Sequence, residues 1–242
     1  MASRSEKTAA AAVHLLTASG AAWGVLALVG IADGRFGAAL AWMLLALLVD
    51  SVDGTLARRF RVREVLPQID GALLDNMVDY LNYAVVPAWF IYEAGLLPEG
   101  FGVAGAMVIC LASAFQFSHA EAKTPDRLFR GFPSYWNVAV WYFLLLGLPP
   151  RANLAIVAVL VILVFVPVYF VYPSRTPAFR RTTLFLTGVW GLLLATLIAR
   201  YPDHAPWPAR LSLLYVAYYF LLSGSLTAAR VRRRSSGRPR SR

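Results

Sequence analysis

Residues 50–79 read DSVDGTLARRFRVREVLPQIDGALLDNMVD, and four acids of this stretch stand out in an otherwise apolar part of the chain: Asp50, Asp53, Asp75 and Asp79. Apolar runs flank the four acids, FGAALAWMLLALLV at 36–49 and YLNYAVVPAWFIY at 80–92. Such runs are typical of membrane spans, where inserting an acid costs about 2.5–3.5 kcal/mol. Acids retained at this depth therefore indicate function, and four converging carboxylates indicate a site for divalent metal ions.

The composition indicates a membrane protein that crosses the bilayer several times. Of the 242 residues, 59% are hydrophobic and only 15% are charged, which is unlike a soluble domain. The first apolar stretch has no early cleavage site, so we expect a retained helix. The single cysteine, Cys110, excludes a disulfide framework. The net charge of +10 would suit a nucleic-acid partner, but the basic residues cluster at the ends of apolar spans, so no nucleic acid is expected.

Eight stretches are apolar enough to cross a bilayer, which takes about 20 residues per helix. We place them at 9–32, 36–59, 70–97, 101–120, 134–149, 152–172, 181–200 and 207–229. An even number puts both termini on one side. Of the 23 Lys and Arg residues, 19 then lie on the face of the termini and only four on the opposite face: Arg35, Arg151, Arg200 and Arg210. The positive-inside rule therefore predicts an all-α, polytopic membrane bundle with both termini in the cytoplasm.

The C-terminal residues 230–242 read RVRRRSSGRPRSR and follow one predicted membrane domain at 1–229. This tail is basic and low in hydrophobicity, so we expect it to be disordered in the cytoplasm. We interpret it first as a topology anchor, and contact with anionic lipid head groups is the alternative.

The spacing of small and acidic residues predicts two helices, each of which carries one functional face. Residues three and four apart share a helix face, which gives one stripe of Asp50, Asp53, Gly54, Ala57 and Arg58 and a second stripe of Gly71, Asp75 and Asp79. An antiparallel pair of helices would bring Asp50 level with Asp79. The same register would bring Asp53 level with Asp75. We expect the four carboxylates to face one point, about two turns from the cytoplasmic surface.

The small residues of this pattern lie on the cytoplasmic side of the acids. Small side chains allow close approach, so a flat nucleotide could rest there with the Arg58 guanidinium beside its ribose or phosphate. Two alternatives are open. Arg58 could instead pair with one of the acids, and Gly54 and Gly71 could each serve helix packing alone. Neither alternative explains the combined pattern.

The string D-x-x-D-G-x-x-A-R…G-x-x-x-D-x-x-x-D is the signature of the CDP-alcohol phosphotransferases, and residues 50–79 resemble it at all eight specified positions. Twelve residues, 59–70, separate the arginine from the second glycine, which is more than most members have. This longer spacing is similar to that of the bacterial phosphatidylcholine synthases, the branch that uses CDP-diacylglycerol and free choline. Three further stretches resemble this branch: VHLLTASGAAWG at 13–24, ARRFRVREVLPQIDGALLD at 57–75 and HAEAKTPDRLFRGFPSYWN at 119–137.

The resemblance implies transfer of the phosphatidyl group from CDP-diacylglycerol to choline, at a site of a bacterial inner-membrane protein that faces the cytoplasm. It implies that Mn²⁺ or Mg²⁺ is held by Asp50, Asp53, Asp75 and Asp79. Asp79 would also be the general base for the choline hydroxyl. The implied CDP-binding residues are Asp50, Gly54, Ala57, Arg58 and Gly71. Thr17 of the first span could bond phosphate or ribose, or equally its own helix backbone.

Choline requires its own recognition, because a quaternary ammonium has no N–H to donate and is bound by aromatic faces. Tyr83 is four residues after Asp79 and shares its face, whereas Tyr80 is adjacent but rotated away. Tyr135 and Trp136 open the fifth span near the cytoplasmic surface. These four aromatic residues are the candidates, and an ordinary interfacial belt of Tyr and Trp is the alternative.

Two other functions stay open at this point. A relative with another acceptor, such as serine or inositol, would keep the metal site and change the acceptor pocket. A cation transporter would use the acids to carry Mn²⁺ or protons, but it would leave the small residues and Arg58 without a role. Members of the resembled family often form homodimers, and no segment of the sequence identifies an interface.

Overall fold

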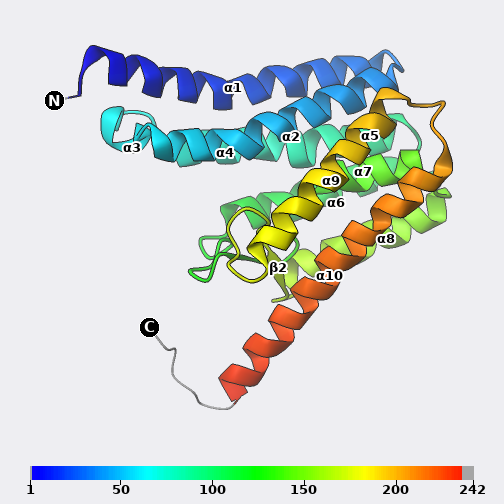
Figure 1. The fold of residues 1–242 in the computed structure, drawn as a ribbon. Coiled ribbons are helices and arrows are strands. Elements are labelled where there is room, and N and C mark those ends of the chain that lie inside the picture. Colours follow the sequence, from blue (N-terminus) through cyan, green and yellow to red (C-terminus); the bar gives the residue numbers. More distant parts are fainter. Residues whose placement is uncertain (1, 236–242) are drawn as a thin grey trace.

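Helices make up most of the protein in the computed structural model, which describes residues 2–235 and the side chains of residues 2–232 (Figure 1). The helices are α1 (Arg4–Ala32), α2 (Phe36–Arg59), α3 (Val62–Val65), α4 (Gly71–Tyr80), α5 (Val86–Glu93), α6 (Gly102–Ser118), α7 (Trp136–Leu145), α8 (Pro150–Phe165), α9 (Arg180–Ala199) and α10 (Pro206–Ser235). A π-helical turn, η1 (Leu81–Val85), joins α4 to α5. Within the described chain, four helices are long and apolar enough to cross a membrane: α1, α2, α9 and α10. The predicted helical membrane fold is confirmed at this level.

The structure differs from the predicted helices in the sixth apolar stretch. The prediction of helix through residue 172 is wrong, because α8 ends at Phe165 and the chain then forms strand β2 (Tyr169–Val171). Pro167 explains the end of α8, since the residue before a proline is disfavoured in helical conformation, and Val166 is extended with ψ of 134°. Strand β2 pairs antiparallel with β1 (Leu128–Arg130), so a short ribbon is added to the predicted all-α bundle.

A second difference lies at the C-terminus. Helix α10 continues to Ser235, so residues 230–235 of the predicted disordered tail are helical. Residues 236–242 of that tail lie outside the described residues.

Side chains of α10 satisfy the second edge of strand β2. The hydroxyl of Thr227 accepts a hydrogen bond from the Tyr169 amide at 2.8 Å, and the Ser223 hydroxyl accepts one from the Val171 amide at 3.1 Å. The Tyr219 hydroxyl donates to the Val171 carbonyl at 3.1 Å. Unpaired backbone groups are costly in an apolar surrounding, and α10 therefore takes the place of a third strand.

Helix α1 packs closely against α4 and η1 because two glycines face them. A Cβ atom added to Gly20 would lie 2.5 Å from Cγ1 of Val78, and one added to Gly24 would lie 2.9 Å from Oδ1 of Asn82. Small residues spaced four apart are the usual means of close helix approach in membranes. The first span is thereby fixed against the segment that carries two of the four aspartates.

Apolar side chains cover the outside of the bundle as well as its interior. Trp136, Trp141 and Phe90 are fully buried at the centre. Many large apolar side chains on the outer helices are more than 60% exposed, among them Phe115, Phe165, Phe185, Leu192, Leu214 and Leu221. Soluble monomers rarely expose large contiguous apolar surfaces, so this exterior suits a lipid surrounding.

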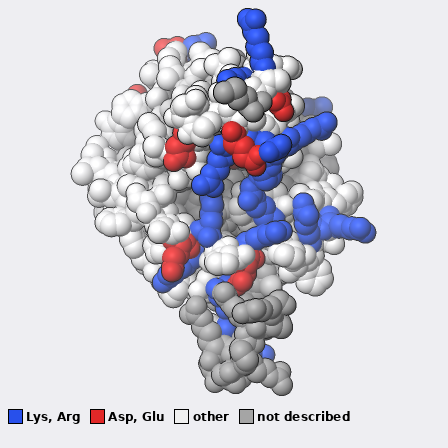
Figure 2. All heavy atoms as spheres, turned by 90° about the vertical axis from the view of Figure 1, so that its left-hand side faces the viewer, with Lys and Arg blue, Asp and Glu red and all other residues white. Residues whose placement is uncertain are grey.

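Basic residues gather at one end of the bundle. The N-terminus, α3 and the segments at 119–127 and 172–179 lie at the left-hand end in Figure 1, and Figure 2 shows many Lys and Arg side chains over this face. The α1–α2, α5–α6, α7–α8 and α9–α10 turns lie at the opposite end. The spatial separation agrees with the uneven distribution of charge along the sequence.

The packing of α1 gives a testable prediction. We expect Gly20→Ala to lower the midpoint of thermal unfolding in detergent, because overpacking costs about 1–3 kcal/mol and Ala gains only about 1 kcal/mol over Gly in a helix. The matched control is Gly191→Ala in α9, where the added Cβ meets no neighbouring group within 4 Å, and its midpoint should be unchanged or higher. Equal midpoints in the two variants would contradict close packing of α1 on α4.

Candidate functional site

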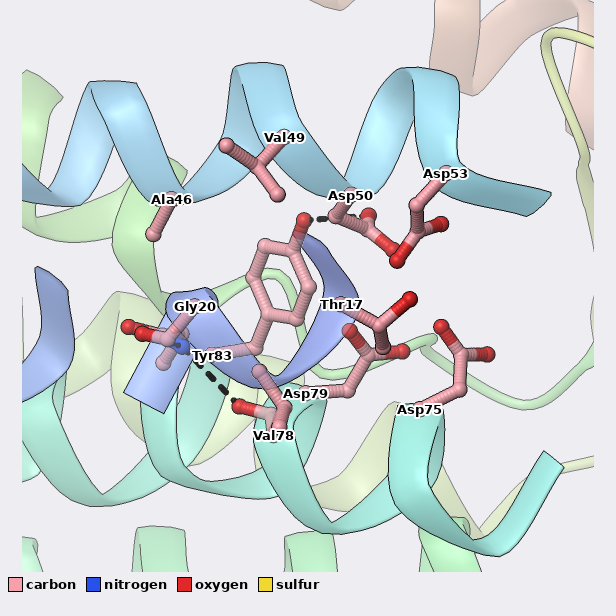
Figure 3. A pocket seen from close by; sticks show the side chains of 11 residues that line it. Thr17, Gly20, Ala46, Val49, Asp50, Asp53, Asp75, Val78, Asp79 and Tyr83 are labelled. Carbon is pink, nitrogen blue, oxygen red and sulfur yellow. Dashed lines mark hydrogen bonds between the residues drawn. The ribbon is translucent and has the colours of Figure 1, made fainter. Parts of the chain in front are cut away.

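The four aspartates line one cavity (Figure 3). Asp50 and Asp53 belong to α2, and Asp75 and Asp79 belong to α4. Spacings of three and four residues place both acids of each helix on one face. In Figure 3, Asp50 of the upper helix lies opposite Asp79 of the lower one, and Asp53 lies above Asp75 at the right-hand end of the cavity. The relative order of the acids that was predicted for antiparallel helices is therefore found.

Helix α1 forms the floor of the cavity, which the sequence did not predict. It packs against both α2 and α4, whereas α2 and α4 hardly touch each other. Thr17 and Gly20 of α1 line the cavity together with Val78 of α4. The predicted pair of directly neighbouring helices is therefore an open pair, held apart and supported from below by α1.

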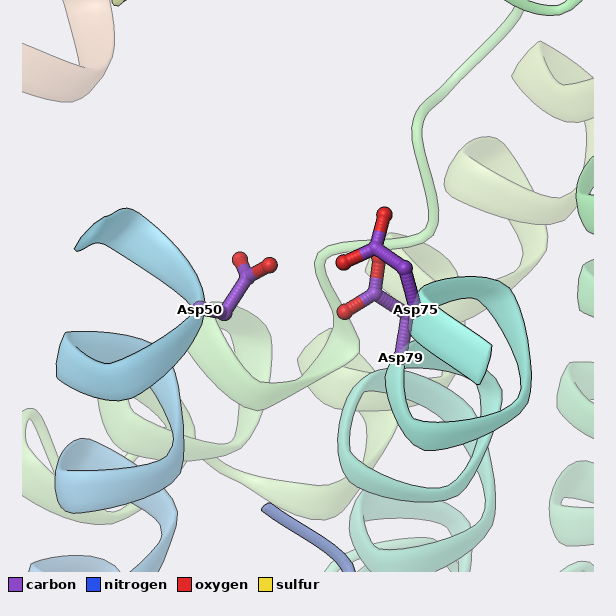
Figure 4. A group of neighbouring side chains, drawn as sticks. All are labelled: Asp50, Asp75 and Asp79. Carbon is purple, nitrogen blue, oxygen red and sulfur yellow. The ribbon is translucent and has the colours of Figure 1, made fainter. Parts of the chain in front are cut away.

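Three of the carboxylates converge closely (Figure 4). One oxygen each from Asp50, Asp75 and Asp79 lies within 4.8 Å of the others. Asp53 lies outside this trio, although it lines the same cavity and is only 4% exposed. The structure thus forms a group of three acids with a fourth beside it.

Ion pairing with arginine does not account for the acids. Arg58 donates instead to the Thr55 hydroxyl at 3.0 Å. Among the residues whose side chains are described, the one ion pair to these acids joins Lys123 to Asp75, with nitrogen and oxygen 4.0 Å apart. One half-exposed lysine does not balance four carboxylates.

The donor set fits a hard divalent cation. Mg²⁺ and Mn²⁺ prefer carboxylate oxygens, and the three closest acids offer oxygens that can converge on one ion. The arrangement is therefore able to bind a metal ion. Its chemistry favours reactions of phosphate groups, whose charge such ions neutralise.

Some of the residues expected to bind CDP lie beside open space, and the others pack against neighbouring helices. Asp50 and Thr17 line the cavity, and the Thr17 hydroxyl also donates to the carbonyl of Val13 at 3.4 Å. Gly54 leaves open space, because a Cβ there would have Nη1 of Arg58, at 3.5 Å, as its one close neighbour. This part of α2 is free to accept a ligand.

Ala57 and Gly71 have packing partners of their own. Ala57 packs against a small apolar cluster that joins α1 to α3 and consists of Ala10, Val13 and Val62. A Cβ at Gly71 would lie 3.1 Å from Cε1 of His14. Helix packing therefore contributes to the requirement for small residues at both positions.

The four aromatic candidates separate into two groups. Tyr83 lines the cavity, and its hydroxyl donates to Oδ2 of Asp50 at 2.6 Å. Tyr135 meets the Tyr83 ring edge to face, with centroids 5.9 Å apart. Trp136 is fully buried and donates to the Ser113 hydroxyl, and the Tyr80 hydroxyl donates to the backbone of Cys110. Of the four, Tyr83 alone lines the cavity, and Tyr135 lies behind it.

Sequence reasoning missed one polar residue of the site, Asn82. Its side-chain nitrogen donates to the carbonyl of Gly20 at 2.9 Å and to that of Val78 at 3.0 Å. Its position three residues after Asp79 within an apolar run was a usable signal, because the two share a helix face. The π-helical geometry of η1 leaves no comparable mark in the sequence.

Comparison with known proteins gives a consistent set of relatives. A phosphatidylcholine synthase of Legionella pneumophila is 39% identical over 218 residues, which cover 87% of this chain and 86% of the relative. One of Borreliella burgdorferi is 38% identical, with 89% and 93% covered. One of Pseudomonas aeruginosa is 42% identical, with 83% and 84% covered. No protein-family model matches the chain.

The acidic trio predicts specific metal binding. We expect Asp75→Asn to weaken Mn²⁺ binding at least about tenfold, because even residues behind the ligands commonly contribute that much. Loss of the electron paramagnetic resonance signal of free Mn²⁺ on titration with protein measures the affinity. The control is Asp33→Asn, an exposed acid paired with Arg35 in the α1–α2 turn, which should bind as the unaltered protein does. Equal affinity in both variants would place the metal elsewhere.

Proposed function

This chain belongs to the phosphatidylcholine synthase family, and from this premise we propose that it transfers the phosphatidyl group of CDP-diacylglycerol to choline, giving phosphatidylcholine and CMP. The relatives that carry the name of this activity match most of the chain and most of their own length. The observation that supports the chemistry is the convergence of three carboxylates within 4.8 Å in one cavity.

The proposed reaction is one displacement that balances without a further reactant. The choline oxygen forms a bond to the phosphorus that carries diacylglycerol, and the bond from this phosphorus to the CMP oxygen breaks. Asp79 accepts the hydroxyl proton as general base. Mn²⁺ or Mg²⁺ bound by the four aspartates would neutralise pyrophosphate charge and stabilise the CMP leaving group.

We propose that the nucleotide lies on the side of the cavity toward the end of α2. Gly54 leaves room for a flat ring, and Asp50 and Thr17 face the cavity. Arg58 has guanidinium donors beyond its bond to Thr55 for ribose or phosphate oxygens. The small residues Ala57 and Gly71 would leave space for the nucleotide beside this part of the cavity.

We propose that choline binds at Tyr83 and Tyr135. The two rings meet edge to face beside the acids, and ring faces together with a nearby carboxylate suit a quaternary ammonium. Trp136 and Tyr80 hydrogen-bond elsewhere, so we assign them to packing in this proposal. The proposed choline site is thereby reduced to Tyr83 and Tyr135, whose substitution can be tested.

The orientation in the membrane is part of the proposal. The eight crossings would be α1, α2, the α4–η1–α5 segment, α6, α7, α8, α9 and α10. The end rich in Lys and Arg would face the cytoplasm of a bacterial inner membrane, with both termini and the active site on that side. Residues 1–229 would form one membrane domain, followed by the basic tail. Homodimerisation stays a prediction without an assigned interface.

An acceptor assay tests the function directly. We expect purified protein with CDP-diacylglycerol and Mn²⁺ to incorporate labelled choline into lipid and to release one CMP per lipid formed. Incorporation of label from serine or inositol, but not from choline, would show that the acceptor is a different alcohol while the reaction class is the same. Uptake of Mn²⁺ into liposomes without any CMP release would instead support a cation transporter.

The role of Asp79 gives a second prediction. We expect Asp79→Asn to lower kcat at least about a hundredfold, because general-base catalysis contributes that much or more. CDP binding, measured by calorimetry, should be largely kept, since the other three aspartates and Arg58 are unchanged. Asp203→Asn in the exposed α9–α10 turn is the control and should keep its activity. Full activity of Asp79→Asn would exclude Asp79 as the base.

A further inference from the structure

The hydroxyl of Tyr83 is engaged with an acid of the cavity. It donates to Oδ2 of Asp50 at 2.6 Å, and the tyrosine is only 4% exposed. This distance falls in the range of charge-assisted O–H···O⁻ hydrogen bonds, about 2.5–2.7 Å. We propose that Tyr83 is a positioning residue that orients the Asp50 carboxylate for a bound metal ion, an inference that rests on the proposed function.

A neutral donor suits this task better than a basic side chain. A carboxylate can rotate about its last bond, and one firm hydrogen bond fixes the direction of its remaining lone pairs. An arginine at this place would fix the direction but would also cancel the charge that attracts the metal. Residues behind the ligands commonly orient metal-binding side chains in this way. Tyr83 thus fixes Asp50 and leaves its negative charge available.

The π-helical turn brings the tyrosine to this position. Tyr83 lies in the middle of η1 (Leu81–Val85), between α4 and α5. A π turn has more residues per turn than an α-helix, so side chains that follow its start point in a different direction than in a regular helix, and such turns often occur at functional sites. In Figure 3 the Tyr83 ring extends across the cavity from the lower helix toward Asp50 on the upper one.

Asn82 fixes this turn against α1. Its side-chain nitrogen binds the carbonyl of Gly20 in α1 and the carbonyl of Val78 in α4. Gly24 allows the close approach, because its missing Cβ would lie 2.9 Å from the Asn82 oxygen. In this proposal Asn82 acts on Asp50 through Tyr83.

Removal of one oxygen atom separates the two roles of Tyr83. The ring is the part proposed to face choline, and the hydroxyl is the part that binds Asp50. Tyr83→Phe should weaken Mn²⁺ binding to the protein alone about tenfold or more, as measured by electron paramagnetic resonance. At saturating Mn²⁺ the KM for choline should be nearly unchanged. Tyr80→Phe is the matched control: it also removes a hydroxyl bond from this segment and should leave Mn²⁺ affinity unchanged.

The proposed link through Asn82 adds a further test. Asn82→Ala should weaken Mn²⁺ binding in the unaltered protein and have little further effect in Tyr83→Phe, because the two residues would act as one unit. Additive losses would overturn this link. Unchanged Mn²⁺ affinity in Tyr83→Phe would overturn the positioning role while leaving the proposed enzyme intact. If the unaltered protein forms phosphatidylcholine but binds no Mn²⁺, the metal site and this inference both fail, and the transfer activity stands.

Discussion

Repulsion among acids in a mostly apolar bundle is the constraint on which the site depends. Three carboxylates come within 4.8 Å of one another, and two unit charges at such a distance repel by on the order of 3 kcal/mol at an effective dielectric constant of about 20. The surrounding helices must hold the acids together against this repulsion. The close contact of α1 with α4 and η1 through Gly20 and Gly24 provides such a support. A divalent cation would then offset the repulsion.

The two ends of the cavity differ in their surroundings. Asp75 lies near the half-exposed Lys123, whereas Asp50 contacts the buried Tyr83. In the proposed reaction the nucleotide occupies the open side and choline the aromatic side. Displacement at phosphorus brings the attacking oxygen in opposite the leaving oxygen, so such a two-sided cavity fits the geometry that the chemistry requires.

Much of the architecture could be predicted from local sequence patterns. Long apolar runs gave the positions of α1, α2, α9 and α10, and spacings of three and four residues gave the shared face of the aspartates. The floor formed by α1 was not predictable in this way, because its contact with α4 joins residues nearly sixty positions apart, such as Gly20 and Val78. The π turn and the β1–β2 ribbon likewise depend on tertiary contacts, although Pro167 marked the end of α8.

The hydroxyl groups of α10 along strand β2 have a consequence for biogenesis. The ribbon lies beside the site through Tyr135, which contacts both Phe129 of β1 and Tyr83. The backbone edge of β2 is satisfied by Ser223, Thr227 and Tyr219, which a ribosome adds about fifty residues after the strand itself. The cavity is lined by the first third of the chain, but the aromatic side chains that pack behind it gain their full support only once the final helix has been made.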